Sequence, residues 1–252
     1  MTEMNINADL HIHTALSPCA HEEMGPQQIL LRAYEMGLNL IGITDHNSVL
    51  NLKSFVEAAD TFKRGSIKIV PGLEIQCEEE VHILCLFETV SAAEEFYKYI
   101  ENYLTDIKNK KSIFGEQLVL DSKGSIIGME ERLLLSSVRL NVERVVAGAH
   151  EFEGLAIAAH IDRPAYSLLS LLGFIPKNLK LDALEVSARV NPQEYIERID
   201  ITGYPIISSS DAHFLSDIGR AYISYKGDLD FYSLKKALLN NKFRILKGGI
   251  NS

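Results

Sequence analysis

The stretch Ala-Asp-Leu-His-Ile-His-Thr (residues 8–14) decides the interpretation of this chain. Its apolar residues alternate with Asp9, His11 and His13, a pattern that predicts a strand. Because alternate residues of a strand share a face, we expect one carboxylate and two imidazoles on the same side. That combination favours a divalent transition metal over a core or solvent-facing role. Later segments of the chain that end in the same way strengthen this interpretation.

The composition is typical of a globular protein. Of the 252 residues, 46% are hydrophobic and 23% are charged. A chain of this length can bury one large core, and α/β barrels of this size commonly form one domain. The 25 basic and 34 acidic residues give a net charge of −9, which disfavours an extended nucleic-acid track or an anionic membrane surface.

The cysteines and the N-terminal residues indicate a cellular compartment. Cys19, Cys77 and Cys85 form neither a Cys-x-x-Cys pair nor a disulfide framework. The first residues lack a basic region followed by an apolar run, and no apolar run is long enough to span a bilayer. We therefore expect a cytoplasmic protein with reduced thiols and no membrane contact. The sequence predicts no particular oligomeric state.

Strands and helices alternate along most of the chain. This order predicts an α/β fold built from βα units, with polar residues at the C-terminal ends of the strands. After the opening strand, the predicted strands are 40–44, 67–70, 81–87, 155–159, 183–186, 206–210 and 243–246, and the predicted helices are 26–36, 52–65, 142–152, 192–199 and 231–239.

Residues 91–150 depart from this alternation. A capping box at 91–94 predicts a helix that continues to about residue 111, and residues 117–127 are typical of a hairpin. The segment is short and lacks a linker rich in Gly, Pro or Ser. We therefore interpret it as an elaboration of a single domain that covers 1–252.

Side chains that can bind metal ions cluster at the ends of the predicted strands. In a parallel barrel these ends meet at one mouth, where such folds place their chemistry. Burying so many ionisable groups without cations would be too costly, and their number indicates two or three metal ions. The set comprises Asp9, His11, His13, Asp45, His46, Glu74, His82, His160, Asp211 and His213.

These residues stand in motifs whose order is specific. The motifs are Asp-Leu-His-Ile-His at 9–13, Thr-Asp-His at 44–46, Pro-Gly-Leu-Glu at 71–74, His82, Ala-His at 159–160 and Ser-Asp-Ala-His at 210–213. The set resembles the PHP (polymerase and histidinol phosphatase) superfamily of metal-dependent phosphoesterases. The resemblance covers most of the chain and implies a distorted (β/α)7 barrel with a trinuclear metal site at its C-terminal mouth.

The resemblance also implies a role for each matching position. Asp9 and Asp45 are expected to orient neighbouring imidazoles, with direct metal contact by Asp45 left open. Glu74 is expected to bridge two metal ions. The implied ligand sets are His11, His13, Glu74 and Asp211 for the first metal, Glu74, His82 and His160 for the second, and His46 and His213 for the third.

One position departs from the family pattern. Relatives carry another ligand of the third metal five or six residues after the second histidine of the first motif. This chain has Pro18 and Cys19 there. We expect Glu23 to replace that ligand because it immediately precedes the next helix, with His21 and Cys19 as alternatives.

The ligand set predicts hydrolysis of a phosphate ester. Bound cations would lower the pKa of a water molecule that attacks phosphorus in line. Arg163 is the predicted phosphate clamp because a guanidinium matches phosphate geometry, and a structural ion pair is its alternative role. Arg189 and Arg220 are further candidates for substrate contact. His46 or His213, where not held by a metal, would protonate the leaving oxygen.

We expect the substrate to be a small phosphomonoester or a nucleotide. A nucleoside bisphosphate or the 5′ end of a short oligonucleotide fits the resemblance, with two or three Mn, Fe or Zn ions as cofactors. Histidinol phosphate is an alternative substrate. A non-hydrolytic metal- or nucleotide-binding regulatory module is the alternative from another class, favoured by the altered third-metal loop. Glu185, near a strand end, is expected to pair with an arginine, and a role in the site is its alternative.

Overall fold

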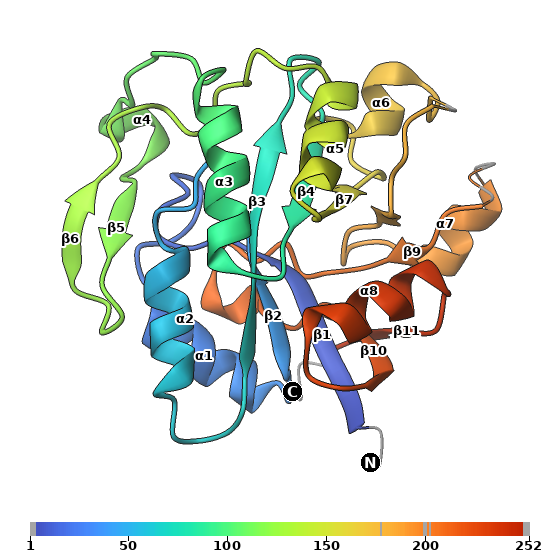
Figure 1. Ribbon diagram of the computed structural model, residues 1–252, viewed down its shortest axis with the longest axis horizontal. Helices are drawn as coiled ribbons and strands as arrows, with labels where there is room; N and C mark the ends of the chain where they lie inside the picture. Colours follow the sequence, from blue (N-terminus) through green and yellow to red (C-terminus); the bar gives the residue numbers. More distant parts are fainter. Residues whose placement is uncertain (1–3, 177, 199–200, 202, 249–252) are drawn as a thin grey trace.

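The computed structural model describes residues 4–176, 178–198, 201 and 203–248. A mixed sheet in the order β11-β10-β1-β2-β3-β4-β7-β8-β9 curls around the centre of the molecule, and helices pack on its outside (Figure 1). The elements are β1 (Met4–Ile12), α1 (Pro26–Glu35), β2 (Leu40–Ile43), α2 (Leu52–Asp60), β3 (Lys68–Gln76), β4 (His82–Leu86), α3 (Val90–Glu101), α4 (Lys111–Phe114), β5 (Leu118–Leu120), β6 (Ile126–Met129), α5 (Val142–Glu151), β7 (Leu155–Ala158), α6 (Leu168–Leu172), β8 (Ala183–Glu185), α7 (Pro192–Arg198), β9 (Ile206–Ile207), a 3-10 turn (Leu215–Asp217), β10 (Ala221–Gly227), α8 (Phe231–Leu239) and β11 (Arg244–Lys247).

The sheet closes on itself at one end. Ala212, which follows β9, pairs in parallel with Ile12 at the end of β1. The amide of His13 donates to Ala212 O at 3.0 Å, and the amide of Ala212 donates to His11 O at 3.2 Å. Strands β1, β2, β3, β4, β7, β8 and β9 therefore form the predicted barrel, while β10 and β11 extend the sheet beside the first half of β1.

One strand distorts the barrel. β4 runs antiparallel to both of its neighbours, β3 and β7, whereas the other adjacent strands of the barrel are parallel. Because β4 runs in reverse, its first residue, His82, lies at the mouth where the parallel strands end. The predicted distorted (β/α)7 barrel is thereby confirmed.

Two apolar cores hold the barrel. Alternate residues of the barrel strands, such as Leu10, Val70 and Ile157, fill its interior together with buried side chains of α8. A larger cluster lies between the strands and the surrounding helices and includes Phe55 and Phe96. Close packing on both faces explains why the strands are short, continuous apolar runs in the sequence.

Several local predictions differ from the structure, and α2 ends at Asp60 rather than at residue 65. α3 ends at Glu101 rather than near residue 111, and its N-cap is Thr89, whose hydroxyl accepts from the amide of Ala92 at 3.2 Å. β3 does not end at residue 70 but continues to Gln76. β10 is a strand that the sequence analysis does not predict.

The predicted helix and hairpin follow β4. β5 and β6 form a separate two-stranded sheet, and Figure 1 shows this hairpin standing at the side of the barrel. It is attached to the loops at the mouth, since Leu118 N donates to Ala15 O at 2.8 Å and Leu120 N donates to Asn51 Oδ1 at 2.9 Å. The interpretation of 91–150 as an elaboration of a single domain stays a prediction. Within the described residues, no helix is long and apolar enough to cross a membrane.

Candidate metal centre

A β-bulge at the end of β1 aims its two histidines into the mouth of the barrel. The pairing of β1 with β2 shifts register between Asp9 and Ile12. Leu10 packs in the barrel interior, yet the next residue, His11, also points inward, and so does His13. Bulges commonly re-aim side chains beside functional sites in this way. His11 and His13 are fully buried, with their Nε2 atoms 3.2 Å apart.

Asp9 consequently does not share their face. Its carboxylate accepts from the amides of Ser210 at 3.0 Å and Gly219 at 2.9 Å. The expectation that Asp9 orients a neighbouring imidazole is therefore wrong. Asp9 instead fixes the segment after β9, which carries Asp211 and His213.

Glu74, on β3, lies at the centre of the cluster. Its Oε2 atom is 3.1 Å from Nδ1 of His46 and 3.2 Å from Nε2 of His13. Its Oε1 atom is 2.9 Å from Nδ1 of His82 and 3.1 Å from Nε2 of His160. One carboxylate thus faces different imidazoles with each oxygen, which is the geometry expected of a bridging ligand.

Asp211 is the second carboxylate of the cluster and lies beside His11 and His13. Its Oδ1 atom lies 3.3 Å from Nε2 of His13 and 3.4 Å from Nε2 of His11. Nδ1 of His213 lies 3.6 Å from the same oxygen. Asp211 and His160 both have positive φ angles, 49° and 31°, which are strained for residues with side chains and occur at functional sites.

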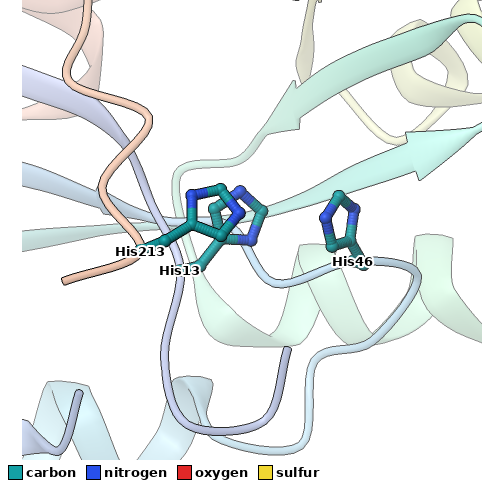
Figure 2. A group of neighbouring side chains, drawn as sticks. All are labelled: His13, His46 and His213. Atoms are coloured by element: carbon teal, nitrogen blue, oxygen red, sulfur yellow. The ribbon is translucent and has the colours of Figure 1, made fainter. Parts of the chain in front are cut away.

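Figure 2 shows the rings of His13, His46 and His213, which come from three different segments and gather at the mouth. The ring centroid of His13 is 4.5 Å from that of His46 and 4.3 Å from that of His213. His46 and His213 are the ligands predicted for the third metal, and the structure places His13 beside them.

The donor atoms fit divalent metal ions. Three groups of residues could each hold an ion, because each residue offers one ligand atom and the ligand atoms of a group all lie within 4.8 Å of one another. The groups are His13, His46 and His213; His11, His13 and Asp211; and His46, Glu74 and His82. Nδ1 of His160 is buried and lacks a hydrogen-bond partner among the described residues. Nδ1 of His46 is also buried, and although it lies 3.1 Å from Oε2 of Glu74, the two atoms do not have the geometry of a hydrogen bond. Buried polar atoms normally have such partners, so a nitrogen and carboxylate set with orphaned atoms favours metal binding.

The charged groups strongly shift one another's pKa. Burial alone would lower the pKa of His13, but hydrogen bonds to Asp211 and Glu74 raise it to about 9. Burial opposes ionisation of Glu74 and Asp211, yet the neighbouring imidazoles hold the pKa of both carboxyls well below the usual range. Burial and the nearby His13 lower the pKa of His213 to about 4. Since a proton on His13 would have to leave before a cation binds, metal affinity should depend on pH.

Hydrogen bonds hold two of the imidazoles from behind. Nδ1 of His11 lies 2.9 Å from Oε2 of Glu185. Nδ1 of His13 lies 3.0 Å from Oγ of Ser17, which donates to Asp45 at 2.7 Å. Asp45 therefore supports His13 through a hydroxyl, in line with the orienting role expected of it.

The sequence indicates a role in the site for Glu185 only as an alternative, and it gives no indication of Ser17. Glu185 was expected to pair with an arginine, and Ser17 was not considered. Glu185 carried a signal, because it ends a strand like the predicted ligands. Ser17 carried none, since a serine in a loop is common.

The structure does not bring Glu23 into the cluster. Its side chain is 68% exposed and its Oε2 lies 3.6 Å from Nδ1 of His21, which is itself exposed. Cys19 is exposed at the rim. The group of His13, His46 and His213 therefore stands without the acidic loop residue that we expected.

The three predicted arginines line one cleft beside Asp211 and His213. Arg163 forms an ion pair with Asp211. Arg220 pairs with Asp217 at 2.6 Å, while Arg189 is exposed. The structure thus shows the ion pair that was the alternative role of Arg163, and it places Arg163 in the cleft beside Asp211 and His213.

Known families cover most of this chain. The sequence model of the PHP domain family matches residues 9–168, and that of a PHP-associated family matches residues 196–242. The chain belongs to the PHP domain family. The PHP resemblance is confirmed, and the first match includes all predicted metal ligands from His11 to His160. Asp211 and His213 of this PHP protein lie within the second matched segment.

Two uncharacterised proteins are similar in sequence. MJ0043 of Methanocaldococcus jannaschii is 29% identical over 131 residues, which are 50% of this chain and 16% of that protein. YqxK of Bacillus subtilis is 25% identical over 263 residues, covering 92% of this chain and 62% of that protein. This PHP chain therefore spans less than two thirds of either relative.

Solved structures share the fold. The lesion-specific endonuclease PfuEndoQ of Pyrococcus furiosus aligns with a TM-score of 0.69 and 24% identity over 96% of this chain and 58% of that one. Endonuclease Q in complex with a 27-mer duplex that has an abasic lesion at the active site aligns with a TM-score of 0.72 and 23% identity over 94% of this chain and 57% of that one.

Proposed function

We propose that this PHP protein is a metal-dependent phosphoesterase that hydrolyses a phosphate ester of a nucleotide. The observation that carries the proposal is Glu74, whose two carboxylate oxygens face separate sets of imidazoles at 2.9 to 3.2 Å. Such a shared carboxylate suits neighbouring cations, and paired cations are a recurrent solution for phosphoryl transfer. Membership of the PHP family and the fold shared with Endonuclease Q support the same chemistry.

The buried imidazoles and carboxylates would hold two or three divalent ions, with Mn, Fe or Zn as candidates. Bound ions would lower the pKa of an attacking water molecule and neutralise the phosphate oxygens. The proposed sets are His11, His13, Glu74 and Asp211; Glu74, His82 and His160; and His46 and His213 with His13 adjacent.

Residues of the cleft would hold the substrate. Arg163 would exchange part of its ion pair with Asp211 for a phosphate oxygen, since a guanidinium forms two parallel hydrogen bonds to phosphate. Where it holds no metal ion, His213 is the proposed donor of a proton to the leaving oxygen, because it is 22% exposed beside the cleft whereas His46 is buried. Arg189 and Arg220 would contact parts of the substrate further from phosphorus.

A nucleoside bisphosphate or the 5′ end of a short oligonucleotide is the proposed substrate class. Endonuclease Q acts on DNA lesions, which extends the candidates to a phosphodiester within a nucleic-acid strand. The test must distinguish this proposal from two alternatives. One is hydrolysis of histidinol phosphate, and the other is a regulatory module that binds metal without turnover.

The decisive experiment measures phosphate release and strand cleavage by protein reloaded with Mn, Fe or Zn. The panel contains nucleoside mono- and bisphosphates, oligonucleotides, histidinol phosphate and sugar phosphates. We expect turnover with nucleotide substrates that falls by at least about 10³-fold in His11→Ala, because its ring faces Glu74 and Asp211. His150→Ala is the matched control, since its partly exposed ring pairs with Asp182 away from the mouth. Stoichiometric metal binding with no turnover of any substrate would contradict the proposal and favour the regulatory module.

A further inference from the structure

Three clefts adjoin one another from the mouth of the barrel along its β11 side. The first, of 520 Å³, lies beside Asp211 and His213. Lys247 lines both the first cleft and a second one of 770 Å³. Arg244 and Phe243 line both the second cleft and a third one of 820 Å³ beside α8. Figure 1 shows the elements involved, β9, α7, β11, β10 and α8, on one side of the barrel in orange and red. We call this series of clefts the basic track.

Positive charge is concentrated along the basic track. Among its lining residues that the structure describes, eight are lysine or arginine and three are aspartate. The whole chain, by contrast, has more acidic than basic residues. The eight are Arg163, Arg189, Arg220, Lys247, Arg244, Lys242, Lys236 and Lys226.

The far end of the track holds cations without acidic partners. Lys226, Lys236, Lys242 and Arg244 are exposed, and within the described part of the chain none has a carboxylate oxygen within 4.0 Å. Charges that the protein leaves unpaired in one groove attract an anionic ligand. By contrast, Arg163 and Arg220 near the mouth already pair with aspartates.

Aromatic rings accompany these cations. Phe214 is 51% exposed in the first cleft and Tyr232 is 71% exposed in the third. Phe243 lies where the second and third clefts adjoin, and Tyr204 lines the second. A positively charged groove with exposed aromatic rings is the arrangement by which proteins bind single-stranded nucleic acids, whose phosphates meet the cations and whose bases stack.

We propose that the basic track binds a single-stranded segment of nucleic acid and leads one of its phosphates into the metal centre. This inference rests on the proposed function for the end at the mouth, where Arg163 adjoins Asp211. The net charge of −9 led to the opposite expectation, because an average over the chain conceals a local excess of cations. A lipid surface would also use the cations and the rings, but a flat bilayer would not follow a series of connected clefts to the mouth.

The test measures binding without turnover. Fluorescence anisotropy follows a labelled oligothymidylate of about 12 nucleotides binding to the protein in EDTA, between 50 and 200 mM salt. The track variant is Lys226→Ala/Lys242→Ala/Arg244→Ala, whose residues lie far from the metal centre. The control is Lys63→Ala/Arg64→Ala/Lys68→Ala, which removes the same charge at the start of β3, at the other end of that strand from Glu74. Circular dichroism verifies that both variants are folded.

We expect the track variant to bind roughly 10-fold more weakly at 50 mM salt. The slope of log affinity against log salt should fall by about 2, since each contact with a single strand contributes about 0.7. Tyr232→Ala should weaken binding with little change in the salt slope, because stacking releases few ions. The control variant should match the wild type in affinity and slope.

Three results would overturn the inference. These are no binding by the wild type, equal weakening in the control and track variants, or sedimentation with phosphatidylserine vesicles that the track variant loses while oligonucleotide binding is unchanged. The proposed function fails separately, through absence of turnover of all phosphate esters by metal-loaded wild type. A protein that binds the oligonucleotide yet hydrolyses nothing would therefore support the track and refute the phosphoesterase.

Discussion

Glu185 is a buried carboxylate that contacts the metal centre from behind, through one of its candidate histidine ligands. Its Oε2 atom lies 2.9 Å from Nδ1 of His11 and accepts from the amide of His160 at 3.2 Å. It therefore fixes the ring of one candidate ligand and the backbone of another. Carboxylates behind a metal-binding histidine set its orientation and raise its basicity.

Glu185→Gln tests this role while preserving the shape of the side chain. We expect metal affinity to fall by about 10- to 100-fold, because the neutral amide no longer raises the basicity of His11. Competition with a coloured chelator measures the affinity, and Glu78→Gln, at an exposed position, is the control. Unchanged metal affinity in Glu185→Gln, with the fold intact, would show that the carboxylate serves only the backbone of His160.

The β1 bulge is the local structure on which the centre depends, and β2 accommodates it with a glycine. A Cβ atom on Gly42 would lie 2.2 Å from Leu10 O, on the bulged part of β1. No residue with a side chain fits there without displacing the strand that carries His11 and His13.

Gly42→Ala is therefore expected to lower the free energy of unfolding by about 1–3 kcal/mol and to weaken metal binding as β1 shifts. Urea denaturation followed by circular dichroism measures the loss. Gly128→Ala, in β6, provides the control because its nearest contact would be 3.8 Å away. If Gly42→Ala is as stable as Gly128→Ala, the strands separate at little cost and the bulge does not depend on the glycine.

The same bulge marks what the sequence could predict about these elements. The alternation of residues 8–14 correctly predicted a strand, and the motifs correctly gathered His11, His13, Glu74 and Asp211. The alternation could not show that Asp9 points away from the face of His11 and His13. A bulge shifts which face each side chain occupies, and it has no signature in the composition. β10 was missed for a related reason, since its pairing with β1 is antiparallel and lies outside the βα alternation.

At the scale of the whole molecule, the average charge does not describe the charge of the individual faces. The excess of acidic residues includes groups buried at the mouth, such as Glu74, Glu185 and Asp211, which a surface ligand does not meet. The cations of the basic track, apart from the half-buried Arg163, are exposed instead. Net charge predicts association only when it is assigned to faces of the folded protein, which the sequence could not do.

The metal centre also ties together segments that are distant in the sequence, so metal removal should be felt by the entire fold. His11, Glu74, His160 and Asp211 come from four strands or strand ends, and ions that bind them only in the folded state stabilise that state. At a free metal concentration about 100 times the Kd, the gain is about 2.7 kcal/mol. For a chain of this length that corresponds to a rise in Tm of roughly 5–10 °C.

Thermal unfolding with EDTA, and then with added Mn or Zn, measures this gain. His11→Ala should show a smaller increase in Tm on metal addition than the wild type, whereas His150→Ala should keep the full increase because its ring pairs with Asp182 outside the mouth. An equal Tm for metal-free and metal-loaded wild type would mean that the ion pairs of Glu74 and Asp211 with their histidines already stabilise the metal-free cluster. The ions would then contribute charge for chemistry without holding the barrel together, and the orphaned nitrogens of His46 and His160 would need another explanation.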